Sequence, residues 1–261
     1  MDLEIPWLGA RAPAKARIGP PAIYGGRPRL YFALLAVLVV VFCCELAFPA
    51  TPASGDVPSI GTLALLGATT GARVFGHNEW WRIFTAPFLH GNVFHLASNA
   101  VVLVVACRWL ERLVGWRWTL AIYCVSGVAG AWFSVIAHPP QTVGVGASGA
   151  ILGLLGALYV VSFRLGPDRM RGKIRKVFFI VAVPAMIPVA ARSATGVDYA
   201  AHVAGAVVGS VLAFTALGIW DHDDREPRYG FYAAMAGAAC FTAAIVGIGQ
   251  IVDLRALYLS R

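Results

Sequence analysis

The stretch Gly144-Val145-Gly146-Ala147-Ser148-Gly149-Ala150-Ile151-Leu152-Gly153 places a serine between glycines at the start of an apolar segment. Gly149 and Gly153 are four residues apart, so they share one face of a helix. Small residues at this spacing let the backbone of a second helix come close. The stretch therefore predicts a tightly packed helix that carries Ser148 at its beginning.

A matching face occurs some fifty residues later, in the stretch from Tyr199 to Gly209. On a helix, His202 shares its face with the small residues at i+3, i+4 and i+7, namely Gly205, Ala206 and Gly209. Two small-residue faces of this kind can dock closely. Their docking would bring a serine hydroxyl and an imidazole together.

The composition identifies the environment of these helices. The chain has 261 residues, of which 59% are hydrophobic and 13% are charged, and its mean hydropathy is +0.71. A soluble domain keeps about a quarter of its residues charged, so this chain is predicted to be a polytopic membrane protein. The net charge is +8, and the positions of the basic residues along the chain fit the positive-inside rule. We therefore expect no nucleic-acid partner.

Seven apolar segments are each close to the ~20 residues that a membrane-spanning helix needs. They lie at 30–48, 93–113, 117–137, 148–166, 174–192, 199–220 and 230–252. The fold class is therefore all-α, a polytopic membrane helix bundle with about seven spans. Residues 1–28 are rich in Pro, Gly, Arg and Lys without apolar periodicity, which predicts a flexible cytoplasmic tail.

The distribution of Lys and Arg predicts the orientation, because cytoplasmic connections carry the excess. Sixteen of the 21 lie in the tail and in alternate connections on one side, and five lie on the other: Arg73, Arg82, Arg192, Arg255 and Arg261. The N-terminus is thus predicted to be cytoplasmic and the C-terminus external, in a multi-pass protein of the cell membrane. Ser148 and His202 then both lie at the outer ends of their helices.

A third polar cluster begins the second span, also at its outer end. It contains His90, His95 and Asn99, and the last two are four residues apart, so they project from one helical face. Polar residues within spans are costly and commonly mark function. Taken singly, Ser148 and Asn99 are more often helix-packing residues and His202 a hydrogen-bonded core histidine, whereas their joint placement favours a site.

These residues together resemble the rhomboid family of intramembrane serine proteases. The resemblance rests on Trp81-Arg82, His90, His95, Asn99, Gly146-Ala147-Ser148-Gly149, and His202 with Gly205 and Gly209, and it covers roughly residues 30–220. It implies a six-helix catalytic core at 29–220. Residues 221–261 would then add a cytoplasmic loop, a seventh transmembrane helix and a short external C-terminus.

The resemblance also implies roles for the residues. Ser148 would be the nucleophile and His202 its base, because a serine hydroxyl needs a group that takes its proton. His95, Asn99 and the Ser148 backbone N–H would stabilise the oxyanion, and His90 would have a structural hydrogen-bonding role. Gly146, Gly149, Gly205 and Gly209 would support the site. The substrates would be transmembrane proteins, cut near their outer ends after small side chains.

Two positions leave the mechanism open. Many rhomboids have a tyrosine one turn after the serine, where this chain has Leu152; an apolar wall would orient the imidazole less specifically. Asp198 lies four residues before His202, so it could orient the imidazole as the third member of a triad. An N-terminal helix cap is the favoured reading of Asp198.

Two further segments carry expectations. The long connection at 50–92 is expected to be partly helical and to lie in the outer leaflet, as in rhomboids. Pro184 and Pro188 are expected to kink the fifth span, beside which similar proteins are thought to admit substrate.

Other classes are disfavoured. His90 and His95 lack the i, i+4 spacing and intervening Glu of a helical zinc site, and neither a metal nor an organic cofactor is implied. Two rivals remain: a catalytically weak or inactive rhomboid-like protein that binds membrane proteins, and a transporter or channel that uses His95, Asn99 and His202 as a polar path.

Overall fold

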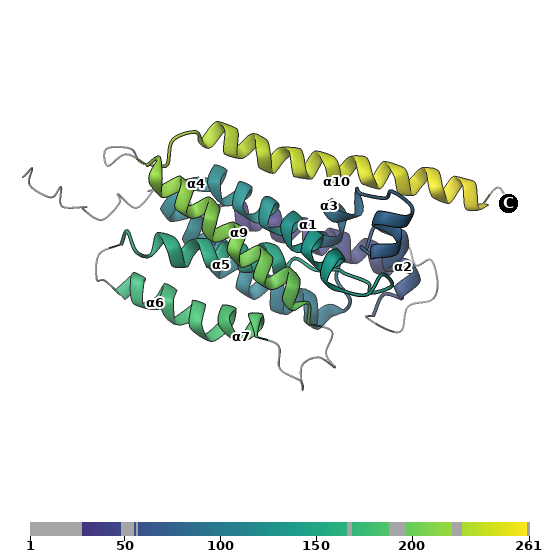
Figure 1. The fold of residues 1–261 in the computed structure, drawn as a ribbon, viewed down its shortest axis with the longest axis horizontal. Coiled ribbons are helices and arrows are strands. Elements are labelled where there is room, and N and C mark those ends of the chain that lie inside the picture. The colour runs from purple at the N-terminus through teal and green to yellow at the C-terminus, as the bar shows by residue number, and fades with distance from the viewer. Residues whose placement is uncertain are drawn as a thin grey trace, which may run out of the picture.

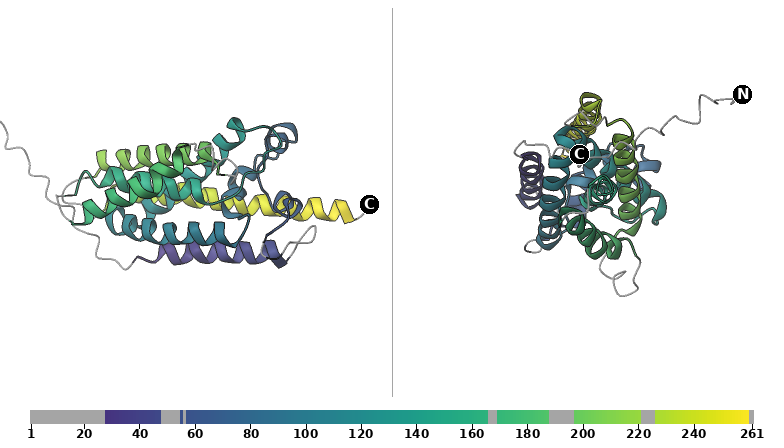
Figure 2. Two further views of the ribbon diagram at one scale, coloured as in Figure 1. Left: turned by 90° about the horizontal axis from the view of Figure 1, so that it is seen from below. Right: turned by 90° about the vertical axis from the view of Figure 1, so that its left-hand side faces the viewer.

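The computed structural model describes residues 28–47, 55, 57–165, 169–187, 197–220 and 226–259, the side chains of 248 and 251–259 excepted. These residues form a bundle whose long helices run roughly along one axis (Figures 1 and 2). The long helices are α1 (Leu30–Ala47), α4 (Val93–Ala137), α5 (Ser148–Val161), α9 (Tyr199–Gly218) and α10 (Gly230–Leu259). Most of the predicted tail and Pro188 lie outside the described residues.

Four of the described helices are long and apolar enough to cross a bilayer: α1, α4, α9 and α10 from Gly230 to Gly247. Helix α4 has 45 residues, more than twice what one crossing needs. It is broken at Gly115, where φ is 81° and ψ is 163°, a conformation that glycine adopts readily. The break yields the two spans predicted at 93–113 and 117–137, and the all-α polytopic membrane bundle is confirmed.

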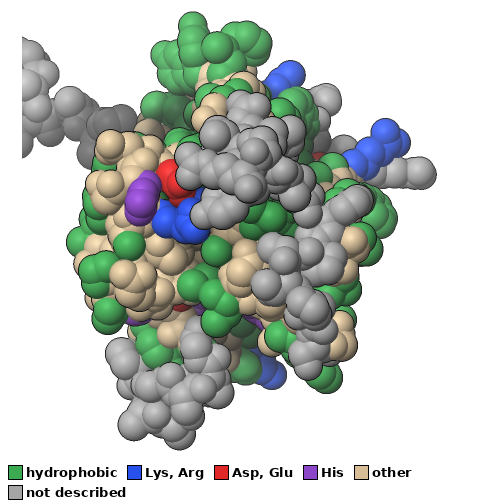
Figure 3. All heavy atoms as spheres, turned by 90° about the vertical axis from the view of Figure 1, so that its right-hand side faces the viewer, with side chains coloured by type: hydrophobic (Ala, Val, Ile, Leu, Met, Phe, Trp, Pro, Cys, Tyr) green, Lys and Arg blue, Asp and Glu red, His purple; other side chains and the backbone are tan. Residues whose placement is uncertain are grey.

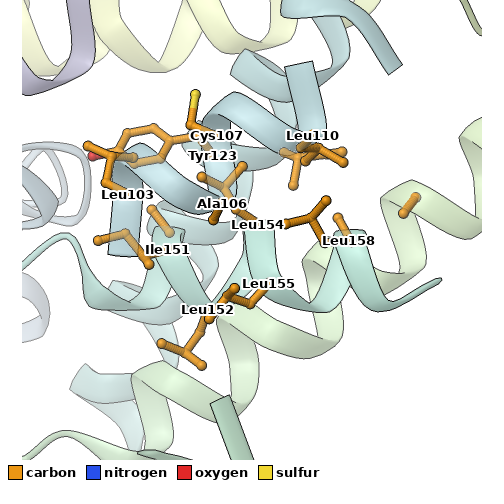
Figure 4. Close-up of a cluster of buried hydrophobic side chains, with 14 of the residues drawn as sticks. Leu103, Ala106, Cys107, Leu110, Tyr123, Ile151, Leu152, Leu154, Leu155 and Leu158 are labelled. Atoms are coloured by element: carbon orange, nitrogen blue, oxygen red, sulfur yellow. The ribbon is translucent and has the colours of Figure 1, made fainter. Parts of the chain in front are cut away.

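Helix α5 is the centre of the bundle and packs against both α4 and α9. Figure 4 shows its residues Ile151, Leu154 and Leu158 beside Leu103, Ala106 and Leu110 of α4, with Leu152 on the other side of α5. With 14 residues, it is shorter than the predicted span 148–166. The chain turns at Ser162, whose hydroxyl donates to the Tyr159 carbonyl at 2.6 Å.

The small-residue faces of α5 and α9 pack so closely that the backbones of the two helices are in contact. A Cβ on Gly205 would collide with the backbone carbonyl group of Gly149, and one on Gly209 would collide with the backbone of Gly153. Since backbone cannot move aside as a flexible side chain can, both positions require glycine for this approach. The approach fixes the beginnings of α5 and α9 next to each other.

The connection before α4 is partly helical, as expected. It contains α2 (Ile60–Leu65), the π-helical turn η1 (Ala72–Gly76), α3 (Arg82–Thr85) and the 3₁₀ turn η2 (Ala86–Phe88). The buried Arg82 side chain organises it by donating to Glu79 and to the carbonyls of Ala64 and Ala68. These bonds satisfy the charge of Arg82 and close the segment into a compact unit.

Two contacts attach this connection to the helices that carry the site. Thr69 and Gly144 exchange backbone hydrogen bonds of 3.0 and 2.9 Å, which ties the connection to the loop before Ser148. Trp80 stacks on Trp132 of α4 with ring centroids 5.3 Å apart. The connection before α4 therefore holds the loop that leads into α5 in place.

The described part of the predicted fifth span, 174–192, lies in α6 (Arg169–Val177), the π-helical turn η3 (Phe178–Ala182) and α7 (Val183–Met186). Pro184 has no N–H to donate, and the turn before it is π-helical, with the Val183 N–H bonded to the Phe178 carbonyl. Ile187 is extended, with φ −95° and ψ 120°. It precedes Pro188 in the sequence, and the residue before a proline avoids the helical conformation.

Candidate active site

Ser148 and His202 lie next to each other although 54 residues separate them. His202 Nε2 is 2.8 Å from Ser148 Oγ. Ser148 is the first residue of α5, and His202 lies in the first turn of α9. His202 is 8% exposed, so the pair is largely withdrawn from solvent. A hydroxyl and an imidazole at this distance can exchange a proton.

The other nitrogen of His202 also has a partner. Its Nδ1 is 2.7 Å from the backbone carbonyl oxygen of Ala185 in α7, and a carbonyl can only accept. Nδ1 therefore carries a proton, which leaves Nε2 free to accept one from Ser148. Because α7 ends at Met186, no N–H of a described residue further along the chain continues the helix and pairs with the Ala185 carbonyl. Sequence reasoning missed Ala185; the nearby prolines of the sequence, Pro184 and Pro188, were the available signal.

Asp198 is the N-terminal cap of α9. Its carboxylate accepts the backbone N–H of Ala201 at 2.9 Å, and its Oδ1 lies 3.8 Å from His138 Nδ1. The imidazole of His202 is oriented by Ala185 and not by Asp198. The prediction that Asp198 caps a helix is thus confirmed.

We expect Asp198→Ala to destabilise the protein by about 1 kcal/mol, the usual cost of losing an N-terminal cap. The folded variant should keep activity within about threefold, because the hydrogen bond from His202 to Ala185 is unchanged. Thermal unfolding and initial cleavage rates measure the two effects. Asp198→Asn retains a capping oxygen and serves as the control. A hundredfold loss of rate in folded Asp198→Ala would show that Asp198 acts on His202 as the third member of a triad.

His95 and Asn99 face the loop that leads into Ser148. Gly146 has φ +123°, and a Cβ built there would lie 2.7 Å from His95 Cε1 and 3.9 Å from Asn99 Nδ2. The backbone conformation and the close approach of the imidazole both require glycine. The structure thus brings His95 and Asn99 to the turn two residues before Ser148.

The Ser148 backbone N–H lies next to the turn that His95 and Asn99 face. Ser148 begins α5 after Ala147, and the first N–H groups of a helix have no acceptor within it. His90 is fully buried, and its ring Nε2 is 3.1 Å from Asn99 Nδ2. The proposed nucleophile, base and oxyanion donors are therefore gathered at one end of the bundle. Figure 3 views the bundle from the end at which α2 and α3 lie, where few of the coloured side chains are charged.

A small cavity of about 20 Å³ adjoins Ser148, which is room for about one water molecule. Polar groups in its lining include Thr69, Ser134 and Asp198. Among the described residues, no group of three or more His, Cys, Asp or Glu side chains could hold a metal ion. The chemistry available here is that of a hydroxyl, an imidazole, hydrogen-bond donors and water.

The chain matches known proteins over this region. Residues 77–219 match the rhomboid domain family. The chain is 30% identical over 214 residues to RHOMBOID-like protein 6, mitochondrial, of Arabidopsis thaliana, covering 77% of this chain and 68% of that protein. It is 31% identical over 156 residues to Rhomboid protease AarA of Providencia stuartii, and this match covers 52% of this chain and 55% of that protein. It is 28% identical over 194 residues to Rhomboid protease GluP of Bacillus subtilis, and this match covers 74% of this chain and 36% of that protein.

The described helices form a polytopic membrane bundle in which a serine and a histidine are in contact. The family match extends over more than half of the chain, from residue 77 to 219. The chain belongs to the rhomboid family. The chain is a multi-pass membrane protein of that family, and proteases are named among its relatives.

Proposed function

We propose that this protein is a serine endopeptidase that cuts transmembrane proteins with Ser148 as nucleophile and His202 as base. The observation that carries the proposal is the 2.8 Å contact between Ser148 Oγ and His202 Nε2. The 2.7 Å bond between His202 Nδ1 and Ala185 supports it, because it selects the tautomer whose Nε2 accepts a proton. Nothing in the mechanism requires Asp198 to act on the imidazole.

In the first half of the reaction, Ser148 Oγ attacks the scissile carbonyl carbon while its proton passes to His202 Nε2. The resulting tetrahedral intermediate collapses to an acyl-enzyme as His202 gives that proton to the leaving amine. In the second half, a water molecule loses a proton to His202 and attacks the ester. The ester bond breaks, Ser148 regains its proton, and the carboxylic product leaves.

The negative oxygen of each tetrahedral intermediate needs donors that are already in place. His95, Asn99 and the Ser148 N–H are the proposed donors. Support comes from Gly146, whose missing side chain lets the His95 ring approach this turn. Gly149, Gly205 and Gly209 support the pair by letting α5 and α9 approach at backbone distance.

The substrate is proposed to be a membrane protein whose transmembrane helix unwinds near its outer end, since the site lies near one end of the bundle. Small side chains before the scissile bond fit the small cavity beside Ser148. The charge distribution supports a cytoplasmic N-terminus and an external C-terminus. Residues 29–220 are proposed as the catalytic core with 221–261 as an addition, and passage of substrate beside the fifth span stays a prediction.

A cleavage assay tests the function. The full chain, reconstituted in proteoliposomes, is mixed with a single-span substrate, and the products are mapped by mass spectrometry. We expect a cut near the outer end of the span, its loss in Ser148→Ala, and labelling of Ser148 by a fluorophosphonate. Ser162→Ala, a buried serine just beyond the far end of α5, is the control and should cut normally.

Binding of the substrate without cleavage, and without fluorophosphonate labelling, would favour the rhomboid-like binding protein. Cleavage that persists in Ser148→Ala would refute the serine mechanism.

A further inference from the structure

Helix α1 contains a buried carboxylate that the proposed reaction does not use. Glu45 lies two residues before the end of α1 and has no exposed surface. An ionisable residue inside an apolar span is costly and usually has a specific partner. The partner here is the backbone N–H of His90, which lies 3.1 Å from Glu45 Oε1 and 3.3 Å from Oε2.

His90 in turn contacts both proposed oxyanion donors of α4. Its Nε2 is 3.1 Å from Asn99 Nδ2, and its ring packs edge-to-face on that of His95, with centroids 5.1 Å apart. An amide nitrogen can only donate, so His90 Nε2 accepts and its own proton is on Nδ1. Burial lowers the pKa of His90 to about 3, so this ring is neutral at physiological pH.

This bond orients the Asn99 amide. One N–H of the amide points to His90, which favours one orientation of the amide about the last side-chain bond. The second N–H is left for another acceptor. Oxyanion donors act only when they are already in place, and displacement by about 1 Å is enough to lose much of their effect.

His90 lies in the turn before α4, not in a helix, so its own backbone does not fix its position. Glu45 belongs to a different helix, 45 residues earlier in the chain. The carboxylate bond to the His90 N–H is charge-assisted or, if Glu45 is protonated, still an N–H to oxygen bond. Either way, α1 holds the turn from which the His90 side chain reaches Asn99 and His95.

Building on the proposed Ser148 and His202 mechanism, we propose that Glu45 is a positioning residue for the oxyanion donors. It acts through His90, which holds the Asn99 amide and the His95 ring in the orientation that the tetrahedral intermediate requires. Glu45 is not a catalytic residue in this mechanism. Its replacement should lower kcat and leave KM nearly unchanged, because the donors are needed in the transition state more than in the bound substrate.

The test is a double-mutant cycle in the full chain in proteoliposomes. Glu45→Met removes the acceptor and should lower kcat by about 10- to 100-fold, the usual effect of losing a group that orients a site residue. Glu45→Gln keeps an acceptor oxygen and should stay within about threefold of wild type. In the Asn99→Ala background, Glu45→Met should lower kcat by clearly less than in the wild type, because one of the two groups that it positions is already gone and only His95 remains.

Glu111→Met is the matched control. Glu111 is a buried carboxylate of α4 that accepts the backbone N–H groups of Arg29 and Leu30 at 2.9 and 3.0 Å, so it also joins α1 to α4 through backbone bonds, away from the proposed site. This variant should lower the melting temperature and leave kcat of the folded protein unchanged. If Glu45→Met does not fold, Glu45→Asp, which draws the carboxylate back by one methylene, goes through the same cycle.

Equal losses of kcat in the wild-type and Asn99→Ala backgrounds would overturn the proposal. A melting-temperature loss with unchanged kcat, as in Glu111→Met, would do so too. These outcomes are distinct from failure of the proposed function, in which cleavage by the wild type would survive Ser148→Ala.

Discussion

His202→Ala is expected to reduce the rate of substrate cleavage by about 10⁴-fold. The hydroxyl of Ser148 is a weak nucleophile unless a base takes its proton, and a positioned base contributes about 10²- to 10⁴-fold. The upper end applies here because His202 contacts Ser148 Oγ at 2.8 Å and would also protonate the leaving amine. Initial rates on a single-span substrate measure the effect.

The double variant gives the sharper comparison. If Ser148 and His202 act as a unit, Ser148→Ala with His202→Ala should be about as slow as either single variant, because residues of one catalytic unit are strongly non-additive. His77→Ala is the control, since His77 is exposed and lies in the turn after η1. Independent losses that multiply in the double variant would show that the two side chains serve different steps.

The pairing of Ser148 with His202 was predictable because both helices carry a recognisable pattern of small residues next to the functional side chain. Each residue begins a small-residue face, and two such faces dock in only a few ways. The charge count added that both lie toward the same end of the bundle. The break between the second and third spans was likewise predicted, between residues 113 and 117.

The orientation of His202 was not predictable in the same way. Its partner is the carbonyl of Ala185, and every residue has a carbonyl, so no residue type marks it. The availability of that carbonyl depends on α7 ending at Met186, and the sequence does not fix that end to the residue. Asp198 was a candidate partner of the imidazole because a carboxylate can be recognised in the sequence. In the fold its side chain caps α9.

The role of Glu45 was hidden for a related reason. A single acidic residue at the end of an apolar run reads as the boundary of a span, where the side chain would meet water. In the fold it is buried against the His90 backbone. Contacts that use backbone groups of a distant segment require the tertiary structure before they can be recognised.

Gly205→Ala is expected to destabilise the protein by about 2 kcal/mol and to reduce the cleavage rate by about 100-fold. The added Cβ would collide with the backbone of Gly149, the residue after Ser148, and overpacking of this kind costs about 1–3 kcal/mol or more. Alanine favours helix over glycine by about 1 kcal/mol, which offsets only part of this. Helix α9 must then move away from α5, and a displacement of about 1 Å at the Ser148 and His202 pair accounts for the rate loss.

Gly218→Ala isolates the collision from the change in helix propensity. It lies at the other end of the same helix, and a Cβ built there meets no atom within 4 Å among the described residues. This variant should unfold at the wild-type temperature or slightly above and should cut normally. Both variants are compared by thermal unfolding and by fluorophosphonate labelling of Ser148. Wild-type stability in Gly205→Ala would mean that α5 and α9 do not approach at backbone distance, and the contact of Ser148 with His202 would then need another cause.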